Sequence, residues 1–96
     1  MRRRYIVSYD VADQKRLRRI YKKMCGFGDP LQLSVFHCEL SETEKILLLE
    51  ALSEIVNSRE DCVMIIDLGV PKEEKDRIEF IGKPLSPPED RCAVIV

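Results

Sequence analysis

The order of extended runs and helical patterns along the chain is the feature that most constrains its fold. Residues 5–9 form an apolar, tyrosine-containing run typical of a strand, and a helical pattern follows them. A second extended run, 31–40, is followed by another helical pattern and by the nearly all-apolar run 62–68. Two strand–helix–strand units around one sheet predict an α/β sandwich, and 96 residues make one such domain.

The first helical pattern is amphipathic and strongly basic. Asp13 is suited to its N-cap, and Gly26 or Gly28 to its stop. Four apolar residues recur at the spacing of one helix face: Leu17, Ile20, Tyr21 and Met24. The opposite face carries six Lys or Arg residues and no acid. Such a face is either a solvated surface or a binding surface for phosphate and other anions.

The extended run 31–40 leaves two possibilities, because its length fits one long strand or two short strands that meet at a bend near residues 32–34. The turn before it is expected at 26–30, where Gly and Pro gather. With the bend, the order becomes βαββαβ, a ferredoxin-like α+β sandwich. The helices would then cover one face of the sheet and leave the other face free to dimerise.

The second helix has a clear start. Ser41 and Glu44 have the spacing of a capping box, and we expect the helix to continue to about Val56. Its expected buried stripe consists of Leu48, Leu49, Leu52, Ile55 and Val56. The run 62–68 is predicted to be a central strand, covered on both faces or buried against a partner. Residues 78–82 are predicted to form a short strand.

The C-terminal residues are predicted to form an arm. Residues 84–90 are rich in proline and suit a stiff extended spacer, and 92–96 are a purely apolar strand pattern. That strand either returns to its own sheet or crosses to the sheet of a partner copy. We favour the crossing, because the arm would otherwise have to double back. The chain is thus divided into a sandwich, 1–82, and an arm, 83–96.

Charge is distributed unevenly, although the formal net charge is only -1. Residues 1–23 carry nine Lys or Arg residues against two Asp residues, which predicts a basic face on an otherwise acidic body. No apolar run approaches the roughly 20 residues of a membrane span, and the N-terminal run is too short for a signal peptide. We therefore expect a cytoplasmic protein without a membrane partner.

Asp10 is the candidate for chemistry. It ends the first strand, where an acidic residue either shapes the turn before the helix or binds a metal ion. His37 is the one histidine of the chain, and no C-x-x-C pair occurs, so a zinc site is not indicated. We expect His37 to be a structural or surface residue.

Several of these segments together resemble a known family. They are the run 5–11 with its Tyr9–Asp10 pair, Asp13 with the basic helix, the run 32–40 with its Q-x-S-V-F pattern, and 60–63. In this combination and spacing they are similar to the small CRISPR-associated adaptation protein, the second of the two core proteins that capture new spacers. The resemblance covers the chain up to about Gly82.

The resemblance implies a ferredoxin-like homodimer in which the terminal strand adds to the partner's sheet. It implies that Asp10 binds Mg²⁺ near the dimer axis, facing its twin, in a metal-dependent endoribonuclease or endonuclease. Tyr9, Ser34 and Phe36 are then the implied catalytic neighbours of Asp10. Arg16, Arg18 and Arg19 are the implied contacts to nucleic acid, either duplex DNA or RNA.

Two functions of different classes fit these expectations. The first is a nuclease in which Asp10 and Mg²⁺ cleave RNA or DNA. The second is a non-catalytic scaffold that holds duplex DNA phosphates with the basic helix and the N-terminal arginines. Its C-terminal arm would dock the CRISPR adaptation integrase. An RNA-binding RRM is disfavoured, because residues 31–40 lack the expected aromatic pattern.

Overall fold

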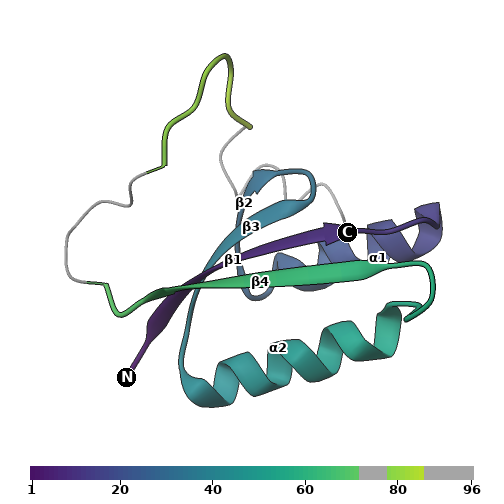
Figure 1. Cartoon of the computed structure of the whole chain (residues 1–96), viewed down its shortest axis with the longest axis horizontal. Helices are drawn as coiled ribbons and strands as arrows, with labels where there is room; N and C mark the ends of the chain where they lie inside the picture. Colours follow the sequence, from purple (N-terminus) through teal and green to yellow (C-terminus); the bar gives the residue numbers. More distant parts are fainter. Residues whose placement is uncertain (72–77, 86–96) are drawn as a thin grey trace.

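The computed structural model describes residues 1–71 and 78–85. Within them lie β1 (Arg3–Asp10), α1 (Gln14–Met24), β2 (Gly28–Gln32), β3 (Val35–Leu40), α2 (Glu42–Ile55) and β4 (Cys62–Gly69). The strands form one antiparallel sheet in the order β2-β3-β1-β4. Figure 1 shows this arrangement, which is the predicted ferredoxin-like α+β sandwich. Neither helix is long and apolar enough, in the part of the chain that is described, to cross a membrane.

The run 31–40 contains the bend that the sequence left open. β2 and β3 are antiparallel neighbours, and Leu33 and Ser34 form the turn between them. The predicted turn at 26–30 is shorter than expected, because β2 already begins at Gly28. Pro30 is tolerated there because β2 is an edge strand, where a proline without an N–H need not donate to a second neighbour.

Both helices begin where the sequence predicts. The Asp13 side chain accepts a hydrogen bond from the backbone N–H of Arg16 at 3.0 Å, which satisfies one free donor of the first turn of α1. At α2 the Ser41 hydroxyl accepts from Glu44 N at 3.1 Å, and the Glu44 carboxylate accepts from Ser41 N at 2.8 Å. This reciprocal pair is the predicted capping box.

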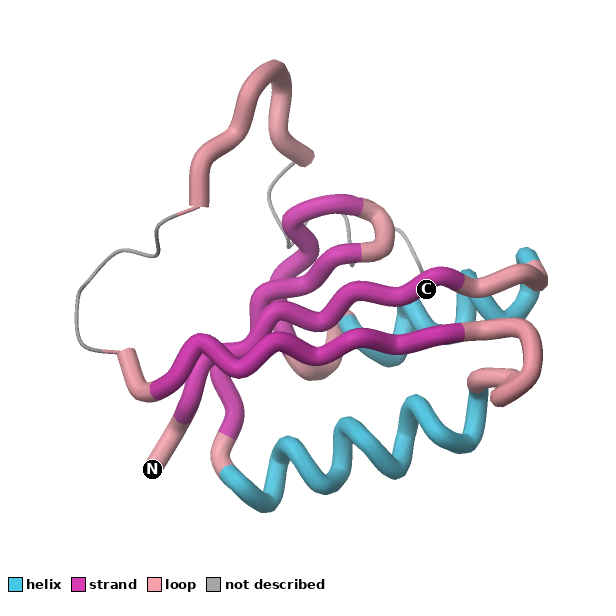
Figure 2. The backbone as a smooth tube through the Cα atoms, in the orientation of Figure 1, coloured by secondary structure: helices cyan, strands magenta, loops and turns pink. Residues whose placement is uncertain are grey.

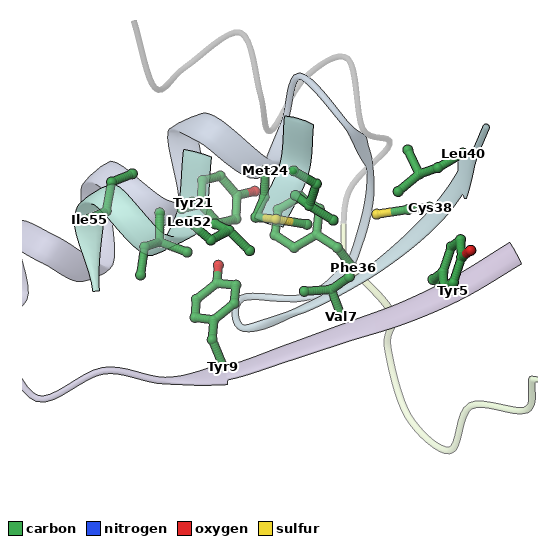
Figure 3. Close-up of a cluster of buried hydrophobic side chains, with 12 residues drawn as sticks. Tyr5, Val7, Tyr9, Tyr21, Met24, Phe36, Cys38, Leu40, Leu52 and Ile55 are labelled. Atoms are coloured by element: carbon green, nitrogen blue, oxygen red, sulfur yellow. The ribbon is translucent and has the colours of Figure 1, made fainter. Parts of the chain in front are cut away.

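The core lies between the sheet and the two helices, which form a second layer on one of its faces (Figure 2). Figure 3 shows Tyr5, Val7 and Tyr9 of β1 pointing toward the helices. The ring of Phe36 is fully buried between Tyr9, at 6.3 Å between centroids, and Tyr21, at 5.3 Å. A slip of one residue in β1 would turn this whole set outward, so burial fixes the register.

Three expectations about apolar segments were wrong in whole or in part. β4 is an edge strand rather than a central one, and Met64, Ile66 and Leu68 are 42–52% exposed in the single chain. The alternative that a partner covers β4 stays a prediction. Leu49 is 42% exposed rather than buried, because α2 turns Leu48 and Leu52 toward the core instead. Residues 78–82 do not form a strand. The predicted terminal strand, and the arm beyond residue 85, lie outside the described residues.

Candidate metal and nucleic-acid site

Asp10 ends β1 on the face of the sheet that the helices do not cover. Side chains alternate along a strand, so Asp10 shares a face with Ile6 and Ser8, whereas Tyr9 is buried on the opposite face. Asp10 is exposed, and its cross-strand partner is Cys62, the first residue of β4. The carboxylate is therefore presented to solvent at a fixed end of the central strand.

The face that carries Asp10 is largely apolar. Ile6 lies between His37 of β3 and Ile66 of β4, and Ser8 lies between Val35 and Met64. We call this the open face, consisting of Ile6, Ser8, Asp10, Val35, His37, Met64 and Ile66. Charged residues border this apolar surface: Asp10 at the end of β1, Asp29 of β2 opposite His37, and the Arg4–Glu39 pair of β1 and β3.

Within the described chain, Asp10 is not part of a cluster of metal ligands. Nowhere in residues 1–71 and 78–85 do three His, Cys, Asp or Glu side chains gather as metal ligands. An exposed carboxylate nevertheless fits Mg²⁺, which takes one or two protein carboxylates and keeps several of its waters. One chain thus offers half of a two-carboxylate site.

The other implied catalytic residues do not join Asp10. Tyr9 and Phe36 are 4% and 0% exposed, and they point toward the helices rather than toward the open face (Figure 3). The Tyr9 hydroxyl donates to the Leu33 carbonyl oxygen at 2.8 Å, and burial raises the pKa of Tyr9 above its usual value. Ser34 accepts from Tyr9 N at 3.1 Å through its carbonyl oxygen. The structure gives Tyr9 and Phe36 a role in the core and Ser34 one in the β2–β3 turn.

The basic helix α1 keeps most of its charges available. Five of its cations are exposed and form no ion pair with another residue of the described chain: Lys15, Arg18, Arg19, Lys22 and Lys23. Two of the three arginines expected to bind nucleic acid, Arg18 and Arg19, therefore remain candidates. A row of unpaired cations on one helix is the charge pattern that phosphate backbones require.

Arg16, the third of these arginines, is committed to an ion pair within the chain. Its Nε lies 2.8 Å from Asp61 Oδ2, and its Nη2 lies 3.1 Å from Asp61 Oδ1 and 2.9 Å from Glu60. The two bonds to one carboxylate form a bidentate pair, in which the Arg16 side chain is only 22% exposed. Arg16 therefore has an internal role, and its expected contact with nucleic acid stays a prediction.

Asp61 is the residue that sequence reasoning missed. Its side chain has no exposed surface, and it also accepts from Ala12 N at 3.0 Å and from Asn57 N at 2.8 Å. Hydrogen bonds from Arg16 and from these amides hold the pKa of Asp61 well below its usual range. In the sequence Asp61 is one acid in a polar turn, and no local pattern distinguishes it from Glu60.

The N-terminal arginines are also paired with acids of the chain, and their expected use on phosphates stays a prediction. Arg2 lies 2.9 Å from Glu44, and Arg3 lies 3.1 Å from Asp67. Arg4 lies 3.5 Å from Glu39, its cross-strand neighbour on β3. Because Arg2 and the β1 residues Arg3 and Arg4 lie beside acids of α2, β4 and β3, the densest group of exposed cations in the described residues is on α1.

Comparison with known proteins agrees with the fold. Residues 1–76 match the family model for CRISPR associated protein Cas2. The CRISPR-associated endoribonuclease Cas2 of Geobacter sulfurreducens is 49% identical over 83 residues, which cover 86% of this chain and 87% of that protein. A second relative, from Rhodospirillum rubrum, is 38% identical over 92 residues, 95% of this chain and 89% of its own.

Solved structures show the same similarity. The crystal structure of Streptococcus pyogenes Cas2 superposes with a TM-score of 0.74 at 28% identity, covering 82% of this chain and 99% of that one. A hypothetical protein from Thermus thermophilus reaches a TM-score of 0.76 at 25% identity, covering 91% and 99%. The chain belongs to the Cas2 family of CRISPR-associated proteins.

Proposed function

We propose that this chain acts as a homodimer in which two Asp10 carboxylates share a Mg²⁺ ion and support cleavage of phosphodiester bonds in RNA or DNA. The observation that carries the proposal is the position of Asp10, exposed at the end of β1 and at the border of the open face. The relatives from Geobacter sulfurreducens and Rhodospirillum rubrum are named endoribonucleases, which supports the reaction class.

The open face supports the homodimer. Met64 and Ile66 are 52% and 42% exposed on neighbouring positions of β4, beside Ile6 of β1. Exposed apolar patches of this kind mark interfaces, and a two-fold axis brings the same residues of both copies together. Two Asp10 carboxylates near such an axis repel each other, and a divalent cation between them relieves that repulsion.

The division of labour among the residues of this chain follows from where they lie. Asp10 would hold the ion, which when bound stabilises charge on a phosphate and activates a water. The exposed cations of α1, Arg18 and Arg19 among them, would bind the nucleic-acid backbone. Tyr9 and Phe36 support β1 and the β2–β3 turn from within the core.

The test compares two charge-matched variants. Asp10→Asn removes the candidate ligand, and Asp29→Asn removes an exposed carboxylate from the edge strand β2. We expect Mg²⁺-dependent cleavage of single-stranded RNA and duplex DNA to be lost in the first and kept in the second. Light scattering should report a dimer for both. Wild-type cleavage rates in Asp10→Asn, or an active monomeric wild type, would contradict the proposal.

The five exposed cations of α1 favour a second candidate function, a non-catalytic scaffold that binds duplex DNA and bridges copies of the adaptation integrase. In that case Asp10→Asn would leave duplex binding and spacer capture intact. The double variant Arg18→Gln, Arg19→Gln would weaken duplex binding and reduce the slope of log K against log salt by about 2. Loss of integrase binding on removing residues 84–96 would support the bridging role, and unchanged binding would contradict it.

A further inference from the structure

We propose that Asp61 is a positioning residue, which fixes the loop after Asp10 and so determines where the Asp10 carboxylate is presented. This inference rests on the proposed function, because it concerns the same candidate metal site. It does not place Asp61 in contact with metal or substrate. Asp61 would act through the backbone of residues 11–13 and through the first turn of α1.

Asp61 joins its own loop after α2 to the distant segment that connects β1 with α1. Its carboxylate accepts from Ala12 N in the β1–α1 loop at 3.0 Å. It accepts from Arg16 Nε in the first turn of α1 at 2.8 Å, and from Asn57 N after α2 at 2.8 Å. We call these contacts the Asp61 junction. The Asp61 side chain itself has no exposed surface, so its carboxylate is shielded from bulk water.

The Asp61 junction completes the restraint on Asp10. On one side Asp10 is held by the β1–β4 ladder, where it is paired with Cys62, the residue directly after Asp61. On the other side Ala12, two residues after Asp10, is held by the Asp61 carboxylate. Arg16 also ties this loop to α1, because its backbone N–H donates to Oδ2 of the N-cap residue Asp13 at 3.0 Å. Asp10 is thus restrained from both directions along the chain.

Such a restraint matters for a site completed by two chains. Each chain supplies one carboxylate. A displacement of the loop in one chain is repeated in the other, so both shifts add to the change in distance between the two Asp10 carboxylates. Residues that orient metal ligands without touching the ion typically change metal affinity by about 10- to 100-fold when removed. The Asp61 junction is the one set of contacts to the loop 11–13 from another part of the described chain that involves a buried carboxylate.

A matched control stands at the other end of the same strand. Asp67 also accepts from an arginine side chain, Arg3 Nε at 3.1 Å, and from a backbone N–H, that of Gly69 at 2.8 Å. Asp67 lies at the end of β4 away from Asp10, since Tyr5 is its cross-strand partner. Asp67→Asn therefore removes an arginine–aspartate pair from β4 without touching the loop after Asp10; this pair is more exposed, with the Asp67 side chain 45% exposed and that of Asp61 0%.

The experiment uses the full chain and Mg²⁺ alone as the probe. Titration calorimetry measures the Mg²⁺ affinity of wild type, Asp61→Asn, Asp67→Asn and Asp10→Asn, and hydrogen exchange measures protection of the Ala12 amide. We expect Asp61→Asn to weaken Mg²⁺ binding by about tenfold or more and to speed exchange at Ala12 by about tenfold. Asp67→Asn should change neither. If Asp61→Asn fails to fold, Arg16→Lys keeps the charge but loses the bidentate pair, and the same pattern is expected.

The outcomes separate this proposal from the proposed function. Mg²⁺ binding that depends on Asp10 but is unchanged in Asp61→Asn overturns the positioning role alone. An equal loss of affinity in Asp67→Asn also overturns it, because the effect would then be one of general stability. Mg²⁺ binding that is the same in wild type and Asp10→Asn overturns the proposed function, and the positioning role with it.

Discussion

Two of the three buried tyrosines of the core allow a paired test of what a hydroxyl contributes. Tyr9 and Tyr21 both pack on Phe36, and both are less than a tenth exposed. The Tyr9 hydroxyl donates to Leu33 O at 2.8 Å, whereas the Tyr21 hydroxyl has no hydrogen-bond partner in the described chain. Substituting each by Phe keeps the ring and removes only the hydroxyl. Tyr9→Phe therefore removes a hydrogen-bonded hydroxyl, and Tyr21→Phe removes a buried hydroxyl that has no hydrogen-bond partner in the described chain.

The two variants are expected to change the free energy of unfolding differently. A neutral intramolecular hydrogen bond stabilises a fold by about 0.5–1.5 kcal/mol. Leu33 lies in an exposed turn, so water can reach the Leu33 carbonyl after the change, and we expect Tyr9→Phe to cost about 1 kcal/mol. A buried polar group without a partner costs about 1–3 kcal/mol, and Tyr21→Phe removes such a group. We expect that variant to be neutral or more stable by about 1 kcal/mol.

Thermal unfolding followed by circular dichroism measures both effects. For a domain of this size, 1 kcal/mol corresponds to about 4–8 °C in Tm. Tyr9→Phe should therefore melt about 4–8 °C below wild type, and Tyr21→Phe at or above it. All samples need the same chain concentration, because dimerisation would make Tm depend on concentration. A Tyr21→Phe variant that loses as much stability as Tyr9→Phe would refute the assignment of the two hydroxyls.

Three further substitutions test local features of the fold. Gly28→Ala places a Cβ against the His37 carbonyl oxygen and 2.6 Å from Cys38 Sγ, so we expect the free energy of unfolding, measured with denaturant, to fall by about 1–3 kcal/mol. The control Gly26→Ala, whose Cβ meets only Lys23 O at 3.4 Å, should be nearly neutral. Equal losses in the two variants would contradict this account. Ser41→Ala removes half of the capping box, and its Tm should fall by the equivalent of about 1 kcal/mol; no change would mean that α2 does not depend on its cap. The pKa of Asp61 is lowered on folding, so its contribution to stability is complete above the unfolded pKa of about 3.9 and is lost as the pH falls toward the folded value. The difference in Tm between wild type and Asp61→Asn should therefore narrow below about pH 4, and a difference independent of pH would be evidence against the ionised carboxylate.

Features that depend on neighbouring residues in the sequence could be predicted. Both N-caps, Asp13 and Ser41, were identified because a cap bonds to an amide only three residues away. The buried stripe of α1 followed from its spacing, and Ile20, Tyr21 and Met24 are buried as expected. The position of Asp10 at the end of the first strand could also be predicted, because the apolar strand pattern ends there.

Features that depend on distant residues could not be predicted. The helix α1 carries three arginines that the sequence does not distinguish: Arg16, Arg18 and Arg19. Only Arg16 forms an ion pair with Asp61, which lies 45 residues later in the sequence. In α2 four apolar residues follow one another, 46–49, so spacing could not show that Leu48 is buried and Leu49 exposed. For β4, an all-apolar strand reads the same whether a sheet or a second copy covers it.

The strand order sets a sequence of events during synthesis. β1 is made first but is the inner strand that β3 and β4 flank, and β4 is the last of the described strands to be made. One edge of β1 therefore has no partner strand until β4, which ends at Gly69, has been synthesised and has emerged from the ribosome. Until then the nascent chain exposes an unpaired strand edge, which is the kind of surface that recruits chaperones or pairs wrongly. Arg3 and Arg4, at the start of that edge, place charge where such wrong pairing would begin.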